Sequence, residues 1–140
     1  MVIPRTISKK VITLSGFFPA VILSGARQTG KTTLLKNIFS NYNYVSLDLP
    51  SQAEQAETSP TRFLSEHGTP LIIDEVQYAP ELFRYVKTAI DQDRHTMGTY
   101  ILTGSQDFSL MKHISESLAD NFRNYGGFPI SPLTISMPPT

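Results

Sequence analysis

The chain has 140 residues, of which 40% are hydrophobic and 17% charged, and its formal net charge is zero. This length suits one domain, and the apolar fraction supports a buried core, so the composition excludes wholesale disorder. The absence of cysteine excludes disulfide-stapled secreted scaffolds and favours a reducing, cytoplasmic compartment. The neutral total argues against a generic basic nucleic-acid binder, and the longest apolar run, residues 17–23, is too short to cross a membrane.

The charges are distributed unevenly along the chain. Residues 1–47 carry six basic and no acidic side chains, whereas residues 48–140 carry six basic and twelve acidic ones. A one-signed stretch of this length directs the search for an anionic ligand to the N-terminal third.

In the N-terminal third, the apolar pattern predicts a helix, a strand, a glycine-rich loop and a second helix. Apolar spacing over residues 7–18 predicts an amphipathic helix that Pro19 ends. The continuous apolar run over residues 20–23 predicts a strand buried on both faces of a parallel sheet. A helix is then predicted over residues 32–39.

The middle of the chain repeats this alternation. Three apolar runs predict further strands, over residues 44–47, 71–73 and 99–102. Between them, the polar stretch over residues 50–61 has room for a short helix, and a longer helix is predicted to begin at Pro80. Another helix is predicted over residues 110–118. Strands that alternate with helices predict an α/β fold with a parallel sheet covered on both faces.

The C-terminal segment differs in character. Residues 124–140 carry no charge and contain four of the ten prolines. We therefore expect a core over residues 1–119 and an irregular, proline-rich tail over residues 120–140, with at most one short strand near residues 133–135.

The segment after the first predicted strand matches G-x-x-x-x-G-K-[ST], the phosphate-binding loop. Its glycines let consecutive backbone N–H groups point at phosphate oxygens, and the following helix adds its positive N-terminal end. In this pattern Lys31 reaches the β- and γ-phosphates and the Thr32 hydroxyl binds Mg²⁺. The predicted nucleotide-binding residues are Gly25, Ala26, Arg27, Gln28, Thr29, Gly30, Lys31, Thr32 and Thr33.

Two acids follow the apolar strand over residues 71–73. Asp74 is predicted to hold Mg²⁺ through water, so Thr32 and Asp74 are the candidate metal residues. Glu75 is predicted to polarise a water for attack on the γ-phosphate. Isolated acids at a strand end are often merely solvated, but the phosphate-binding loop makes a catalytic pair the favoured interpretation.

A polar side chain at the end of the fourth strand is predicted to lie between the loop and Asp74, where it would hold the attacking water or the γ-phosphate. Ser105 is the first choice, followed by Thr103 and Gln106. The predicted catalytic residues are therefore Glu75, Lys31 and Ser105. A helix N-cap at Ser105 is an equally good interpretation and is compatible with the first.

Together these segments resemble the N-terminal ATPase core of a prokaryotic group of AAA+-type P-loop ATPases, with motifs over residues 25–35, 44–48, 71–77, 100–105 and 115–119. The resemblance implies a P-loop NTPase three-layer sandwich in which the loop-bearing strand lies beside the fourth strand. It implies ATP and Mg²⁺ as ligands and a nucleotide-driven switch. The recipient of that switch is left open between self-association and a protein target.

The sequence departs from the group after Ala119, where Gly-Arg and a fifth strand are expected but Asp120-Asn121-Phe122 follows. We therefore expect a truncated member that lacks the fifth core strand, with the loop-bearing strand at an exposed, aggregation-prone edge of the sheet. No arginine finger is evident in the sequence, so the prediction of ATP binding is stronger than the prediction of ATP hydrolysis. The alternatives are an inactive nucleotide-binding fragment or interaction module and, less favoured, a small-molecule kinase.

Overall fold

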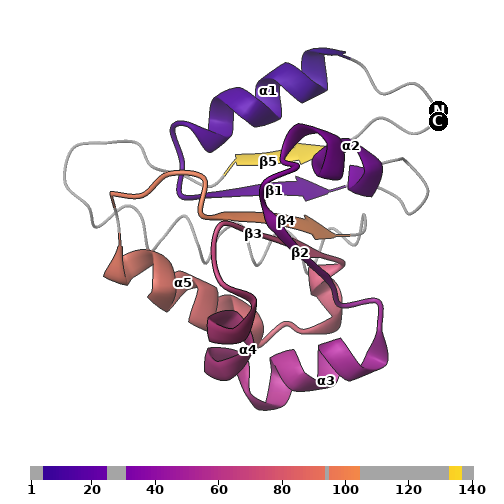
Figure 1. The fold of residues 1–140 in the computed structure, drawn as a ribbon, viewed down its shortest axis with the longest axis vertical. Helices are drawn as coiled ribbons and strands as arrows, with labels where there is room; N and C mark the ends of the chain where they lie inside the picture. Colours follow the sequence, from indigo (N-terminus) through magenta and orange to yellow (C-terminus); the bar gives the residue numbers. More distant parts are fainter. Residues whose placement is uncertain (1–4, 25–30, 94, 105–132, 137–140) are drawn as a thin grey trace.

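The structure, a computed structural model, describes residues 5–24, 31–93, 95–104 and 133–136. These residues form three layers, with helices on both faces of one sheet (Figure 1). The helices are α1 (Arg5–Ser15), α2 (Lys31–Ile38), α3 (Pro50–Thr58), α4 (Pro60–His67) and α5 (Leu82–Gln92), together with the short 3-10 helix η1 (Val76–Tyr78). The strands are β1 (Ala20–Ser24), β2 (Asn43–Ser46), β3 (Leu71–Asp74), β4 (Tyr100–Gly104) and β5 (Leu133–Ser136). The predicted α/β fold class is confirmed.

The sheet has five strands in the order β2-β3-β4-β1-β5, and every neighbouring pair is parallel. The β1–β4 register runs from Ala20 opposite Tyr100 to Ser24 opposite Gly104, so the loop-bearing strand lies beside the fourth strand as expected. Because all strands are parallel, β1, β3 and β4 end at the same edge of the sheet. This edge collects the polar residues that follow each apolar run.

The expectation that the sheet lacks a fifth strand is wrong. β5 pairs in parallel with β1, with Val21 opposite Leu133 and Ser24 opposite Ser136. Strand β1 therefore has a neighbour on each side, and the predicted exposure of its edge is wrong as well. Strand β5 falls where at most one short strand was expected, and the prediction missed its pairing with β1, which no local sequence pattern reports.

Several helix boundaries also differ from the prediction. Helix α1 ends at Ser15 rather than at Pro19, because residues 16–18 form turns that close on the last helical carbonyls. Two helices occupy residues 50–67 where one short helix was expected, and each begins with a proline at its first position. Helix α5 begins at Leu82, two residues after the predicted start. The helix predicted over residues 110–118 lies outside the described residues. None of the described helices has the length and apolar character that a membrane span requires.

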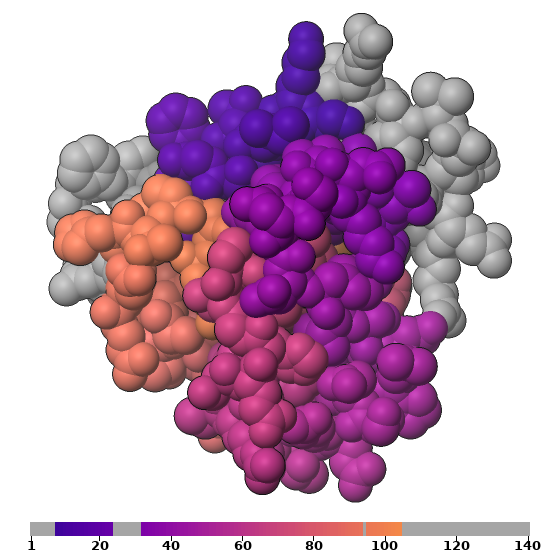
Figure 2. Space-filling model, viewed as in Figure 1, coloured from indigo at the N-terminus to yellow at the C-terminus, as the bar shows by residue number. Residues whose placement is uncertain are grey.

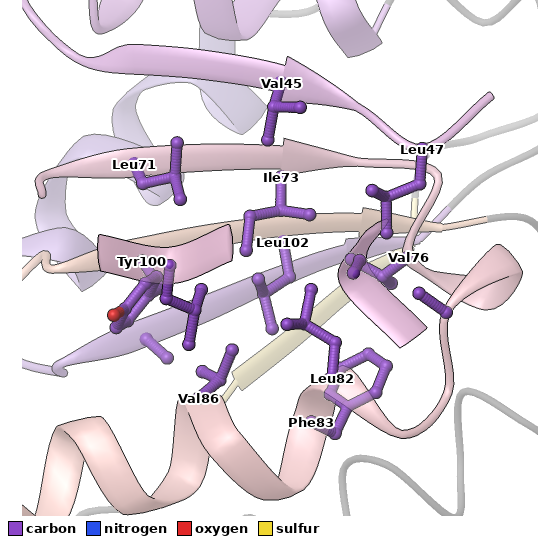
Figure 3. Packing of buried hydrophobic residues seen from close by; sticks show 14 of the residues in the cluster. Val45, Leu47, Leu71, Ile73, Val76, Leu82, Phe83, Val86, Tyr100 and Leu102 are labelled. Carbon is purple, nitrogen blue, oxygen red and sulfur yellow. The ribbon is translucent and has the colours of Figure 1, made fainter. Parts of the chain in front are cut away.

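The larger apolar cluster lies between the sheet and helices α3, α4 and α5. In Figure 3, Leu82, Phe83 and Val86 of α5 point toward Ile73 and Leu102 of the strands. The strands supply every second residue to this side, as the alternation of a pleated strand requires. Burial of these side chains fixes β3 and β4, which end in the polar residues of the candidate site.

A second cluster lies on the opposite face of the sheet, beneath α1 and α2. Val11 of α1 and Leu35 of α2 pack there with Val21, Ile72 and Ile101 of the strands. The described parts of α1 and α2 lie side by side on the surface in Figure 2, in indigo and purple. This packing places the first turn of α2 at the carboxyl edge of the sheet, near the end of β3.

Gly98 closes the turn before β4 in a backbone conformation that disfavours other residues, with φ +67°. A Cβ at Gly98 would lie 2.7 Å from the carbonyl oxygen of Ser15 and 2.8 Å from the hydroxyl of Tyr42. The Tyr42 hydroxyl also donates to the Gly98 carbonyl at 2.6 Å. The position therefore joins the end of α1 to the start of β4.

We predict that Gly98→Ala lowers the free energy of unfolding by about 2–3 kcal/mol, because both the positive φ and the contact with the Ser15 backbone oppose a side chain. Urea denaturation measures the change. Gly16→Ala is the matched control, since the nearest atom to a Cβ there is the Thr13 carbonyl oxygen at 3.4 Å. Equal stability of the two variants would contradict the prediction.

Candidate functional site

Asp74 ends β3 at the carboxyl edge of the sheet, and its side chain is buried. Three hydroxyl groups donate to its carboxylate. Thr32 Oγ1 lies 2.6 Å and the Tyr44 hydroxyl 2.7 Å from Asp74 Oδ2, and Thr103 Oγ1 donates to Oδ1. The donors come from α2, β2 and β4, so three elements far apart in sequence converge on one carboxylate.

The apolar run before Asp74 explains its position. Residues 71–73 are buried among the two apolar clusters, which hold β3 in the interior of the sheet. Thr32 is the second residue of α2, and Leu34 and Leu35 of this helix pack in the apolar cluster beneath α1 and α2. The carboxylate and the helix start are thereby fixed by packing rather than by the polar contacts alone.

Thr103, fully buried at the end of β4, links the two predicted acids. Its Oγ1 accepts a hydrogen bond from the Glu75 backbone N–H at 3.1 Å and donates to Asp74 Oδ1. A hydroxyl has one proton, so the bond from the Glu75 N–H leaves that proton directed at the carboxylate. Thr103 thus sets the orientation of both acidic residues.

Glu75 has a left-handed backbone, with φ 58° and ψ 51°, and its side chain is buried. This conformation costs a non-glycine residue about 1–3 kcal/mol and persists only where the surroundings enforce it. Here the hydrogen bond to Thr103 holds the Glu75 backbone, and Gln77 Nε2 donates to Glu75 Oε2 at 2.6 Å. The turn after β3 therefore directs the Glu75 carboxylate toward η1 and Gln77.

Tyr44 reaches Asp74 from β2, the neighbouring strand. Burial, and then the hydrogen bond with Asp74, raise the pKa of Tyr44 above its usual value, while the Ser46 and Thr32 hydroxyls act in the opposite direction. The phenol is therefore protonated at neutral pH and acts as a donor. The Nζ of Lys36 lies 4.1 Å from the centre of the Tyr44 ring, a cation–π contact from α2.

The structure describes some of the predicted site residues and leaves others outside the described ranges. Asp74, Glu75 and Thr32 lie at the same edge of the sheet, and Lys31 is the first residue of α2. Thr33 is exposed on α2. The predictions for Gly25, Ala26, Arg27, Gln28, Thr29, Gly30, Ser105 and Gln106 fall outside the described residues.

Sequence reasoning ranked Thr103 below Ser105, and it did not single out Tyr44 or Gln77 for the site. The signal for Tyr44 is a hydroxyl side chain within β2, but its importance can be recognised only once β2 is known to pair with β3. The signal for Gln77 is its place two residues after Glu75. That spacing brings the side chains together only because Glu75 turns the chain sharply.

The donor set fits a hard divalent cation. A hydroxyl oxygen of Thr32 and a carboxylate oxygen of Asp74 lie 2.6 Å apart, and Mg²⁺ prefers oxygen ligands. Within the described ranges, no three His, Cys, Asp or Glu side chains gather in a metal-binding group. Mg²⁺ suits such a sparse set because it commonly takes one or two protein ligands and completes its shell with water and phosphate.

We predict that Thr103→Val lowers the free energy of unfolding by about 2–3 kcal/mol, since a methyl group would leave Asp74 Oδ1 and the Glu75 N–H without this buried partner. Thr103→Ser, which keeps the hydroxyl, should lose less than about 1 kcal/mol. Chemical denaturation of both variants checks the difference. If valine is tolerated as well as serine, the hydroxyl does not hold the two acids.

The protein-family model described as an AAA domain matches residues 18–135 of the chain. Uncharacterized proteins of Mycobacterium tuberculosis and Mycobacterium bovis are each 32% identical to it over 103 residues. The matched segment covers 72% of this chain and 23% of each relative. The match therefore spans less than a quarter of the length of these relatives.

Two solved structures share this fold. A Walker-type ATPase of Pyrococcus abyssi superposes with a TM-score of 0.60 at 15% identity, covering 99% of this chain and 54% of that chain. The DnaC helicase loader superposes with a TM-score of 0.54 at 15% identity, covering 96% of this chain and 89% of that chain. At such low identity the similarity establishes the fold, a P-loop NTPase sandwich, and leaves the activity to the residues of the site.

Proposed function

Because this chain belongs to the AAA domain family, we propose that it binds ATP with Mg²⁺ and hydrolyses the nucleotide to drive a conformational switch. The observation that carries the proposal is the contact between Thr32 Oγ1 and Asp74 Oδ2 at 2.6 Å. It joins the first turn after the phosphate-loop sequence to the carboxylate after β3, the pair that holds Mg²⁺ in P-loop NTPases.

Each residue has a role in this proposal. Residues 25–30 and the N-terminus of α2 bind the phosphates through backbone N–H groups, and Lys31 neutralises charge on the β- and γ-phosphates. Thr32 and Asp74 hold the magnesium ion, which when bound neutralises charge that develops on the phosphate oxygens. Glu75 accepts a proton from the attacking water.

The geometry around Glu75 supports the role of general base. Its carboxylate is buried, and Gln77 Nε2 binds one carboxylate oxygen at 2.6 Å, which restricts the rotation of the side chain. The Glu75 backbone N–H donates to Thr103 Oγ1, which in turn donates to Asp74, so the turn that carries Glu75 is connected to a candidate metal residue. A base held close to the metal residues needs little rearrangement to reach a water near the γ-phosphate.

A change in the Glu75–Gln77 contact during turnover would be the start of the proposed switch, whose recipient is a second copy of the chain or a protein target.

We predict that Lys31→Ala and Glu75→Gln separate binding from hydrolysis. Lys31→Ala should weaken Mg-ATP binding by about tenfold or more, because a phosphate-neutralising charge is removed. Glu75→Gln should bind Mg-ATP with nearly unchanged affinity and release phosphate about 100-fold or more slowly, because only the base is lost. Calorimetric titration and a phosphate-release assay measure the two quantities.

Matched controls come from exposed positions on other elements. Lys10→Ala removes an exposed ammonium from α1, and Glu81→Gln removes an exposed carboxylate that lies 3.7 Å from Arg84. Both should bind and hydrolyse ATP like the unaltered chain. An unaltered chain that binds Mg-ATP without releasing phosphate would support the inactive-module alternative. Phosphate release that survives in Glu75→Gln would overturn the assignment of the base.

A further inference from the structure

The Tyr44 side chain spans the distance between an apolar cluster and the candidate metal site. Its ring packs against the cluster beneath α1 and α2, and its hydroxyl donates to Asp74 Oδ2 at 2.7 Å. In the β2–β3 register, Tyr44 lies opposite Ile72 and Ser46 lies opposite Asp74. Tyr44 thus reaches two residues along the neighbouring strand, a distance that a long aromatic side chain covers.

Helix α2 contacts this unit at two points. Thr32 donates to the same oxygen, Asp74 Oδ2, and Lys36 places its Nζ 4.1 Å from the centre of the Tyr44 ring. Thr32 and Lys36 are four residues apart and therefore share one face of the helix. The helix that follows the phosphate-loop sequence therefore contacts both the Tyr44 ring and the carboxylate oxygen to which the Tyr44 hydroxyl donates.

We propose that Tyr44 is a positioning residue that fixes the orientation of the Asp74 carboxylate for magnesium binding, an inference that rests on the proposed function. Thr32 and Tyr44 approach Oδ2 together while Thr103 approaches Oδ1, so rotation of the carboxylate breaks at least one charge-assisted hydrogen bond. Such outer contacts hold a metal-binding carboxylate in one orientation and commonly change metal affinity by about 10- to 100-fold when they are removed.

Tyr44 is also the donor that permits a clean test. Thr32 is a proposed ligand of the metal, and the Thr103 hydroxyl holds the backbone of Glu75 as well as Asp74. Replacing either would disturb more than the carboxylate orientation. Tyr44→Phe removes the hydroxyl, keeps the ring in the apolar cluster, and leaves the nucleotide-binding residues of the loop unchanged.

The experiment titrates Mg²⁺ into the full chain in the presence of a fluorescent ATP analogue and measures binding of the same analogue in EDTA. Tyr44→Phe should raise the half-saturating Mg²⁺ concentration about tenfold, with affinity in EDTA within about twofold of the unaltered chain. Tyr42→Phe is the matched control, since its hydroxyl donates to the Gly98 carbonyl in the turn before β4. It should leave both quantities unchanged.

If Tyr44→Phe fails to fold, Lys36→Met provides the second test, because it removes the charge over the ring from an exposed position and keeps the phenol. A rise of about two- to fivefold in half-saturating Mg²⁺ with unchanged affinity in EDTA is expected. The positioning role would be overturned if Tyr44→Phe and Tyr42→Phe had the same half-saturating Mg²⁺ concentration. Where Tyr44→Phe does not fold, it would be overturned if Lys36→Met and the unaltered chain had the same half-saturating Mg²⁺ concentration. An unaltered chain that binds the analogue in neither condition would instead contradict the proposed function.

Discussion

A carboxylate buried at the end of a central strand is the constraint around which the site is arranged. Burying the charge of Asp74 is costly unless hydrogen-bond donors surround it, and Thr32, Tyr44 and Thr103 supply them. Each donor comes from a different element, so the carboxylate requires α2, β2 and β4 to converge on the end of β3. The parallel sheet makes this possible by ending neighbouring strands at one edge.

The hydrogen bonds around Asp74 also offer a route for the proposed conformational switch. The first turn of α2 and the left-handed turn at Glu75 both contact the Asp74–Thr103 pair. A ligand of Asp74 would therefore act on the Glu75 backbone through Thr103, and a ligand of Thr32 would do so through Asp74 and Thr103. This short path gives the proposed switch a physical route from the metal site to Gln77 and η1. It belongs to the chain's own residues and requires no long-range network.

Much of the fold could be predicted because its signals are local. Continuous apolar runs predicted β1, β3 and β4, and the alternation of their side chains between the two apolar clusters followed from the pleat. A short strand near residues 133–135 was allowed for, but its place in the sheet was wrongly predicted, because pairing of β5 with β1 joins segments more than 100 residues apart, which no local pattern reports. Helix α4 was missed because only one short helix was assigned to residues 50–61, whereas Pro60 stands at the start of a second helix.

The candidate site likewise has residues whose positions could be predicted from the sequence and residues whose positions could not. The placement of Asp74, Glu75 and Thr32 at one edge of the sheet was predictable because short motifs in single segments specify it, and their chemical roles stay predictions. The contacts of Tyr44 depend on strand order, and those of Thr103 and Gln77 depend on the backbone turn at Glu75, so sequence spacing alone could not specify them. Residues 25–30 and Ser105 remain predictions, supported by the motif and by the positions of the elements that flank them.

The most direct test of the account is a thermal melt of the chain with and without millimolar Mg-ATP, set beside the same melt of Asp74→Asn. Binding to the folded state stabilises it, so the account predicts a rise in melting temperature of about 5 °C or more for the unaltered chain. The rise should vanish or fall sharply in Asp74→Asn. An unchanged melting curve for the unaltered chain, or an equal rise in both proteins, would contradict a nucleotide site organised by this carboxylate.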